Sequence, residues 1–217
     1  LDTALPPGAP SSPNLFTNLF LATVLGLGLA IAIAVLREVF DDRMRSVEDV
    51  ERKLRVPVLG QTPYVSHTLA DELDSVFSPI SEAYSSIRAT LDFALPRASH
   101  PVIQFTSSQP GEGKTTSAVA LATRFAALGR KVLLIDMDLR RPSVAKALGL
   151  ERAQTGVVDV LYSRVPLERA LANCGIENLF VLPTGQIPHN PVEILSSGLL
   201  PEFLARHRRD FDVIVID

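Results

Sequence analysis

The longest apolar run in the chain covers residues 15–36 and holds no charged side chain. A helix of that length extends about 33 Å, which is the thickness of the hydrocarbon core of a bilayer. A buried helix of a soluble domain is the alternative, but such helices are rarely apolar on every face. A signal peptide fits less well, since the proline-rich segment before the run carries no lysine or arginine. The pattern therefore predicts a transmembrane helix over residues 15–36.

Shorter periodic patterns predict the elements that follow. A short apolar strand is expected at residues 101–108. Two apolar runs without polar alternation indicate buried parallel strands, at residues 131–135 and 211–217. The helical pattern between the first two strands stops at Gly129, a usual C-terminal signal. A short amphipathic helix is expected from the capping residue Ser46 to about Leu54. A longer helix with one buried face is indicated by apolar residues at helical spacing: Ile80, Ala83, Ile87, Leu91 and Ala94.

Composition and charge narrow the class of protein. The net charge is −3 and the isoelectric point about 5.8, so no global basic field argues for nucleic acid as a partner. The single cysteine, Cys174, excludes an internal disulfide and fits a reducing compartment. The chain starts without methionine and stops inside an apolar run. We therefore expect it to be a piece of a longer protein.

The two flanks of the predicted span differ in charge. The preceding residues 1–14 are proline-rich, which is typical of a stiff extended stalk, and contain only one charged residue, Asp2. Basic residues gather after the span: Arg37, Arg43, Arg45, Arg52, Lys53 and Arg55. The positive-inside rule therefore places the C-terminal side in the cytoplasm.

The segment SSQPGEGKTT, residues 107–116, lies between a predicted strand and a predicted helix. That context is the one that a phosphate-binding loop needs, because backbone N–H groups and the helix N-terminus favour an anion. Lys114 would reach the β- and γ-phosphates, and Thr115 would offer its hydroxyl to Mg²⁺. The full motif has glycine where this chain has Ser108, and a glycine-rich turn without nucleotide is the alternative. The expected nucleotide-binding residues are Gln109, Pro110, Gly111, Glu112, Gly113, Lys114, Thr115 and Thr116.

Acidic residues stand at the ends of two predicted strands. Asp136 and Asp138 follow the strand at 131–135, and Asp217 ends the run at 211–217. Ligands of open α/β sheets bind outside the carboxyl ends of the strands, so these carboxylates are expected to converge near the phosphates. The predicted magnesium ligands are Thr115, Asp138 and Asp217. The predicted catalytic residues are Lys114, Asp136, Asp138 and Arg140, the last of which would stabilise phosphate charge.

These motifs together predict an α/β fold of the P-loop NTPase type. It would have a mostly parallel sheet with helices on both faces, preceded by one transmembrane helix. Residues 142–210 are expected to add short helices and one strand.

The ordered set of motifs resembles the bacterial tyrosine kinases of exopolysaccharide and capsule assembly, also called polysaccharide co-polymerases. The resemblance covers nearly the whole chain. It is carried by VEDVERKLRVPVLGQTP, EAYSSIRATL, SSQPGEGKTT, LLIDMDLRRPS, GVVDVLY, VLPTGQIPHNPVEIL and FDVIVID. It implies ATP and Mg²⁺ at the loop and acids named above, with Asp136 engaging an incoming tyrosine hydroxyl. It also implies a ring of identical subunits that phosphorylate one another's tyrosine-rich tails, and work with the polysaccharide polymerase and export machinery.

The resemblance also implies a location and a domain organisation. The chain would lie in the bacterial inner membrane with its N-terminal end periplasmic. A proline-rich segment at 1–14 and the span at 15–36 would lead into a cytoplasmic linker at 37–79. A P-loop kinase domain, truncated at its C-terminus, would then occupy residues 80–217.

The chain departs from the family at the helix before the loop. The family often has Glu-x-x-Arg-x-x-Arg there as a subunit contact, whereas this chain has Glu82, Ser85 and Arg88. Three alternatives stay open: a co-polymerase ATPase that transfers no phosphate to protein, a partitioning or division-site ATPase, and a purely structural membrane anchor. The partitioning reading fits less well, because such proteins usually carry a second lysine at the position of Gln109 and lack a span.

Overall fold

The computed structural model describes residues 14–41, 46–63, 78–95, 100–151 and 153–217. Three parts of the chain named above lie outside the described residues: the proline-rich segment before Asn14, Arg43 with Arg45, and the whole stretch at 64–77. The chain divides into two compact units, Leu1–Val58 and Leu59–Asp217.

Helix α1 (Leu15–Val39) contains the predicted span and extends it by one turn. None of its residues is buried within the protein, although the helix is strongly apolar. Among the described residues it is the one helix whose length and composition suffice to cross a membrane. Ser46 caps helix α2 (Val47–Leu54) as expected: its side chain accepts a hydrogen bond from the Asp49 N–H at 3.2 Å.

The second unit is built on a sheet with the strand order β1-β5-β2-β4-β3. The described strands are β1 (Val102–Gln104), β2 (Val132–Ile135), β3 (Ala172–Asn173), β4 (Leu179–Leu182) and β5 (Val213–Ile216). All the pairings are parallel except that of β3 with β4. The edge strand β3 corrects the prediction of one strand within 142–210. At two residues it is too short to give a periodic signal.

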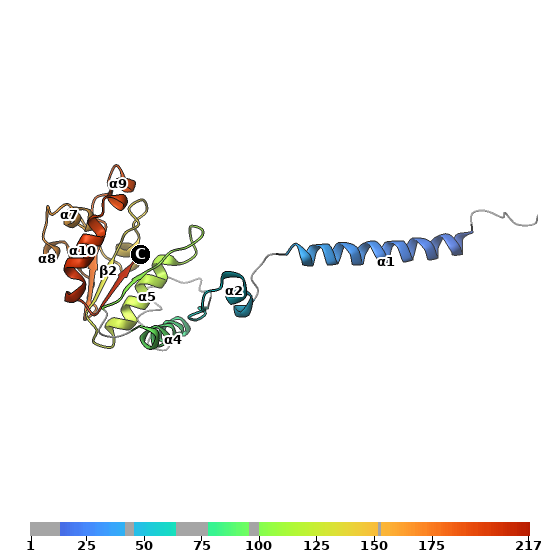
Figure 1. The fold of residues 1–217 in the computed structure, drawn as a ribbon, viewed down its shortest axis with the longest axis horizontal. Helices are drawn as coiled ribbons and strands as arrows, with labels where there is room; N and C mark the ends of the chain where they lie inside the picture. The colour runs from blue at the N-terminus through green and yellow to red at the C-terminus, as the bar shows by residue number, and fades with distance from the viewer. Residues whose placement is uncertain (1–13, 42–45, 64–77, 96–99, 152) are drawn as a thin grey trace, which may run out of the picture. The chain divides into compact units, whose positions relative to one another are not determined.

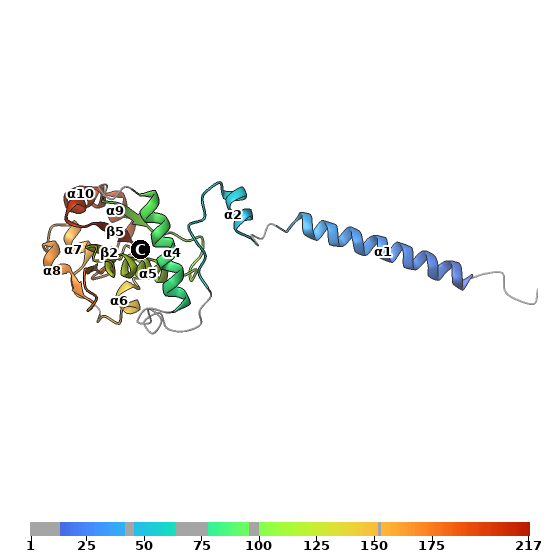
Figure 2. The same ribbon diagram turned by 90° about the horizontal axis from the view of Figure 1, so that it is seen from below.

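Helices cover both faces of this sheet. The described ones are α4 (Pro79–Ala94), α5 (Lys114–Ala126), α6 (Val144–Ala147), α7 (Val157–Leu161), α8 (Leu167–Ala170), α9 (Pro191–Ser196), α10 (Leu199–His207) and a 3-10 turn (Arg208–Asp210). Figure 1 shows α7, α8 and α10 on one side of the strands and α4 and α5 on the other. The turned view of Figure 2 also shows α4 beside α5. The predicted layered α/β fold is thereby confirmed.

Alternate residues of each central strand supply two separate cores. Val132 and Leu134 of β2 pack toward α4 and α5, whereas Leu133 and Ile135 pack with α7 to α10. All four are fully buried, which explains why their run shows no polar alternation. The buried face of α4 differs from the prediction at one end. Ala94 is exposed, so the buried stripe does not extend to the last turn of the helix.

Candidate nucleotide-binding site

Parallel pairing places two acidic residues at one edge of the sheet. Ile135 of β2 lies opposite Ile216 of β5, so the next residue on each strand is an aspartate. The Asp217 N–H donates to the Ile135 carbonyl at 3.0 Å, which continues the ladder past the strand ends. Asp136 and Asp217 therefore stand side by side at the carboxyl edge, where α/β sheets bind ligands.

The first turn of α5 reaches the same edge. Lys114 Nζ donates to Asp217 Oδ1 at 2.7 Å, and Thr115 Oγ1 donates to Asp217 Oδ2 at 2.6 Å. The Asp217 side chain is fully buried, whereas that of Lys114 is 22% exposed. The structure thus brings together the lysine and threonine of the predicted loop with the acid of the last strand. We call Lys114, Thr115 and Asp217 the Lys114 cluster.

The loop before α5 has the backbone that its glycines predict. Gly111 and Gly113 adopt φ values of 85° and 83°, which side chains disfavour, and Gly113 caps the helix. Glu112 folds back, and its carboxylate accepts from the N–H groups of Ser108 at 2.9 Å and Gln109 at 3.1 Å. The Gln109 N–H, followed by the Ser108 hydroxyl, lowers the pKa of Glu112 below its ordinary value.

Asp136 is buried, with 1% of its surface exposed, yet its carboxylate is well supplied with donors. Its Oδ2 accepts from the N–H groups of Ser143 and Val144, both at 3.0 Å, and its Oδ1 from that of Asp138 at 3.2 Å. Burial raises the pKa of Asp136 to about 6, and the nearby charge of Asp217 adds to the rise against the opposing hydrogen bonds.

Asp138 and Arg140 do not join the Lys114 cluster. Asp138 Oδ1 accepts from the backbone N–H groups of Arg140 at 3.2 Å and Arg141 at 2.9 Å, so it caps the turn that follows β2. The Arg140 side chain is exposed and lines a neighbouring cavity. The roles of Asp138 as a magnesium ligand and Arg140 as a catalytic group stay predictions.

The donor set suits a hard divalent cation only in part. Within the described ranges, no three His, Cys, Asp or Glu residues come together as a metal cluster. The oxygens of the Thr115 hydroxyl and the Asp217 carboxylate nevertheless lie together, 2.6 Å apart. Oxygen atoms are the ligands that magnesium prefers in proteins. Magnesium keeps several waters and takes further ligands from substrate phosphates, so two protein oxygens fit a P-loop ion.

Two residues that the sequence did not single out, Ser143 and Thr184, hold this site. Thr115 donates its hydroxyl hydrogen to Asp217, so the Ser143 hydroxyl, 2.8 Å away, must donate to Thr115. Thr184, which follows β4, donates its hydroxyl to the Asp136 carbonyl at 2.9 Å. For Ser143, its position shortly after Asp136 and Asp138 was a signal in the sequence that it could lie at the site. Thr184 is brought in by the pairing of β2 with β4.

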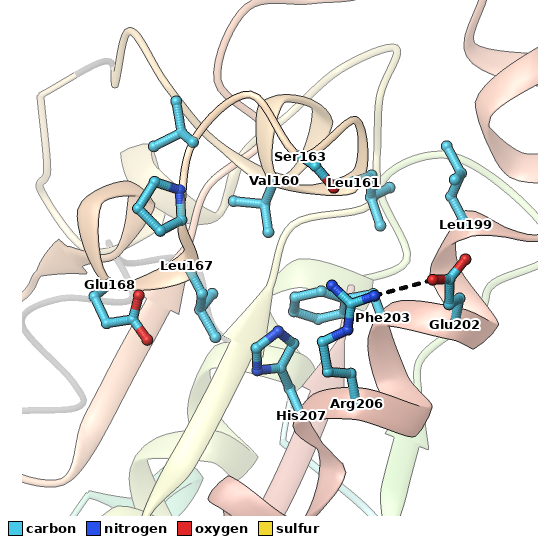
Figure 3. A pocket seen from close by; sticks show the side chains of 12 residues that line it. Val160, Leu161, Ser163, Leu167, Glu168, Leu199, Glu202, Phe203, Arg206 and His207 are labelled. Carbon is cyan, nitrogen blue, oxygen red and sulfur yellow. Dashed lines mark hydrogen bonds and ion pairs between the residues drawn. The ribbon is translucent and has the colours of Figure 1, made fainter.

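Two cavities lie near these elements, and they differ in whether predicted site residues line them. A cavity of about 540 Å³ has Asp136 in its lining, together with the loops that follow β2 and β4. Another, of about 430 Å³, lies between the α7–α8 segment and α10, where Arg206 pairs with Glu202 at 3.0 Å (Figure 3). None of the predicted site residues lines the second cavity. The first cavity is therefore the one connected with the candidate chemistry.

Comparison with known proteins places this site in a family. Residues 100–217 match a family model described as an AAA domain. Tyrosine-protein kinase YwqD of Bacillus subtilis is 40% identical over 137 residues, which are 63% of this chain and 57% of that protein. Tyrosine-protein kinase ptk of Acinetobacter johnsonii is 30% identical over 230 residues, which cover 100% of this chain and 31% of that protein. The chain thus spans between a third and little more than half of these relatives.

Solved structures give the same assignment. The chimerical protein CapA2B2 superimposes with a TM-score of 0.70 at 32% identity, over 79% of this chain and 74% of that one. The BceF tyrosine kinase domain superimposes with a TM-score of 0.68 at 29% identity, over 80% of this chain and 76% of that one. The chain therefore belongs to the AAA-domain family, in its branch of bacterial tyrosine-protein kinases.

Proposed function

We propose that the intact protein is an ATP-dependent tyrosine kinase that phosphorylates tyrosines on copies of itself. The observation that carries this proposal is the Lys114 cluster, in which a loop lysine and threonine meet the acid of a separate strand. Such a cluster is the phosphate and metal end of a P-loop site. The relatives named as tyrosine-protein kinases support tyrosine as the acceptor.

The residues of the chain divide the work of transfer. The loop N–H groups from Gly111 to Thr115 and the Lys114 ammonium would bind the phosphates of ATP. Thr115 and Asp217 would hold Mg²⁺, which neutralises phosphate charge when bound. Lys114 must then leave the Asp217 carboxylate and bind a phosphate oxygen instead, so that Asp217 is free to bind the metal. The ion pair thus keeps the lysine within reach of the site before nucleotide arrives.

Asp136 is suited to receive a proton near neutral pH. In the transfer, the tyrosine oxygen bonds to the γ-phosphorus, the bond from that phosphorus to the bridging oxygen breaks, and ADP leaves. The hydroxyl proton passes to Asp136. A general base is most effective when its pKa lies near the operating pH, and the pKa of Asp136 is about 6. Asp136 lines a cavity, so an acceptor side chain can reach it although it is buried.

The setting of this activity follows from the first unit and from the resemblance. Helix α1 would anchor the protein in a bacterial inner membrane, with the catalytic unit cytoplasmic and the N-terminal end periplasmic. Its partners would be its own subunits in a ring and the machinery that polymerises and exports an exopolysaccharide. In α4, Arg88 is held by Asp92 at 2.7 Å, and Asp92 also binds Arg130 at 2.7 Å. Ring contacts through α4 must therefore use other residues or break this pair.

Phosphotyrosine detection on the intact protein tests the proposal. Wild type with ATP and Mg²⁺ is expected to label, and Lys114→Ala to lose nearly all label. Lys53→Ala, which removes a lysine of the first unit, serves as the control and should label as wild type does. Equal label on wild type and Lys114→Ala would overturn the kinase assignment. Release of phosphate by wild type without any phosphotyrosine would instead indicate the ATPase that does not modify protein.

A further inference from the structure

The cavity beside Asp136 is lined mainly by apolar side chains, with Asp136 itself among the lining residues. Its volume of about 540 Å³ exceeds the space that a single tyrosine ring needs. The walls come from two loops, after β2 and after β4, and include Pro142, Ala145, Leu150, Pro183 and Ile187. An aromatic side chain that enters here would point its hydroxyl toward Asp136.

Hydrogen bonds and a close backbone approach hold the two loops in place. The β2 loop donates two N–H groups to Asp136, and Thr184 of the β4 loop donates to the Asp136 carbonyl. Gly156 packs directly on the backbone of Pro183 and Gly185, where a side chain would not fit. The Val157 N–H adds a bond of 2.8 Å to the Pro183 carbonyl. The two segments that form the cavity are thus fixed relative to each other by contacts of their backbones.

The rim of this cavity carries positive charge that no ion pair among the described residues neutralises. Arg140, Arg141 and Lys146 line it and are exposed. None of the three forms an ion pair with another residue in the part of the chain that the structure describes. Asp138, the nearest acid in sequence, uses its Oδ1 for the backbone N–H groups of the two arginines. Three cations around an apolar cavity therefore face solvent.

We propose that this cavity selects its acceptor, and that it prefers a tyrosine flanked by acidic residues. The inference rests on the proposed function and adds the substrate class. The apolar walls would bind the ring, while Arg141 and Lys146 would pair with carboxylates on either side of it. Ion pairs at an exposed rim are individually weak, so two pairs together predict a preference of about three- to tenfold.

Charge reversal on both partners tests the preference. The whole chain in detergent is assayed with two fluorescent peptides that differ only in having glutamates or lysines around one tyrosine. Wild type should bind and phosphorylate the glutamate peptide about three- to tenfold better. Arg141→Glu/Lys146→Glu should abolish or invert that ratio. Arg169→Glu, an exposed arginine of α8 that does not line the cavity, should keep the wild-type ratio, and added salt should reduce it.

The readouts separate this inference from the proposed kinase activity. Peptide binding, measured by fluorescence anisotropy, is also recorded with Lys114→Ala, in which transfer is expected to fail. Preferential binding that the rim variant loses supports the inference even if no peptide is phosphorylated. An equal ratio in wild type, or an unchanged ratio in Arg141→Glu/Lys146→Glu, overturns it. Phosphorylation of both peptides with no preference would overturn the inference and leave the kinase assignment standing.

Discussion

Lys114 Nζ lies 2.7 Å from Asp217 Oδ1, although the two residues are 103 positions apart in the chain. The pair joins the first turn of α5 to the end of β5, and its carboxylate is fully buried. A buried carboxylate needs such partners, because its desolvation is not offset otherwise. The contact therefore serves both the predicted phosphate site and the stability of the nucleotide-free protein.

The first prediction concerns this ion pair. Lys114→Met should destabilise the nucleotide-free protein by about 3 kcal/mol, because the Thr115 hydroxyl is then the one side-chain donor left to Asp217 among the described residues. Lys114→Met/Asp217→Asn should recover part of that loss, since it removes the unpaired charge. Urea denaturation of the single and double variants gives the coupling between the two sites. Strictly additive effects would show that the pair is not energetically coupled.

The second prediction is a pH dependence that belongs to Asp136. Its pKa is raised from 3.8 to about 6, so between these values the folded state keeps a proton that the unfolded chain releases. Stability contributed by this group therefore falls as pH rises from about 4 to 6, by up to about 3 kcal/mol. Asp136→Asn removes the effect. In urea denaturation without nucleotide and metal, the free energy of unfolding of Asp136→Asn minus that of wild type should therefore rise as pH increases from about 4 to 6.

A comparison with wild type is needed because other carboxylates titrate over the same interval. Their contributions cancel in the difference between the two proteins, which leaves that of Asp136. A difference that stays constant from pH 4 to 6.5 would contradict the raised pKa.

The third prediction concerns a hydrogen bond between α4 and α5. The Tyr84 hydroxyl lies 2.7 Å from Ser117 Oγ, one turn beyond Lys114, and Tyr84 is 5% exposed. Tyr84→Phe should lower the free energy of unfolding by about 1 kcal/mol, and Ser117→Ala by a similar amount. Because both remove the same bond, the double variant should lose less than the sum. Thermal unfolding of the three variants measures this, and independent losses would argue against the contact.

The fourth prediction concerns the approach of two loops. In Gly156→Ala, the new Cβ would collide with the Pro183 carbonyl oxygen and the Gly185 nitrogen. The β4 loop would shift, and Thr184 with it. The free energy of unfolding should drop by about 1–3 kcal/mol, and phosphorylation per folded molecule should fall as well.

Gly198→Ala is the matched control for that variant. Its Cβ meets nothing within 4 Å, but its φ of 75° disfavours alanine. It should lose about 1–2 kcal/mol of stability and keep its activity per folded molecule. Equal losses of activity in both variants would show that the loop contact does not position Asp136.

The fifth prediction concerns membrane insertion of α1. An arginine in place of Leu27, near the centre of the helix, should cost about 2.5–3.5 kcal/mol of insertion free energy. An arginine in place of Leu15, at its end, should cost much less, because a terminal side chain can reach the interface. Extraction of cell membranes with alkaline carbonate should release Leu27→Arg and retain Leu15→Arg. Equal retention of both would argue against a span centred on this helix.

Local pattern was enough to predict most elements of the second unit. The loop glycines, the helix that starts at Lys114 and the apolar runs around 132–135 and 213–216 all depend on neighbours in sequence. Edge strand β3 was missed because two residues carry no period. Tyr84 is not among the residues whose spacing predicted the buried face of α4, yet it is buried against α5.

The sequence by itself determined the conformation of the longer segments, since turns, caps and periodicity are local properties of the chain. It also determined which residues could bind phosphate, through the types present at 109–116. Only the tertiary structure decided which acid meets Lys114. The strand order places β5 between β1 and β2, so Asp217 lies under the loop while Asp138 turns away to cap its own strand end. Strand order is set by the joint packing of both faces of the sheet, and no short stretch of sequence carries that information.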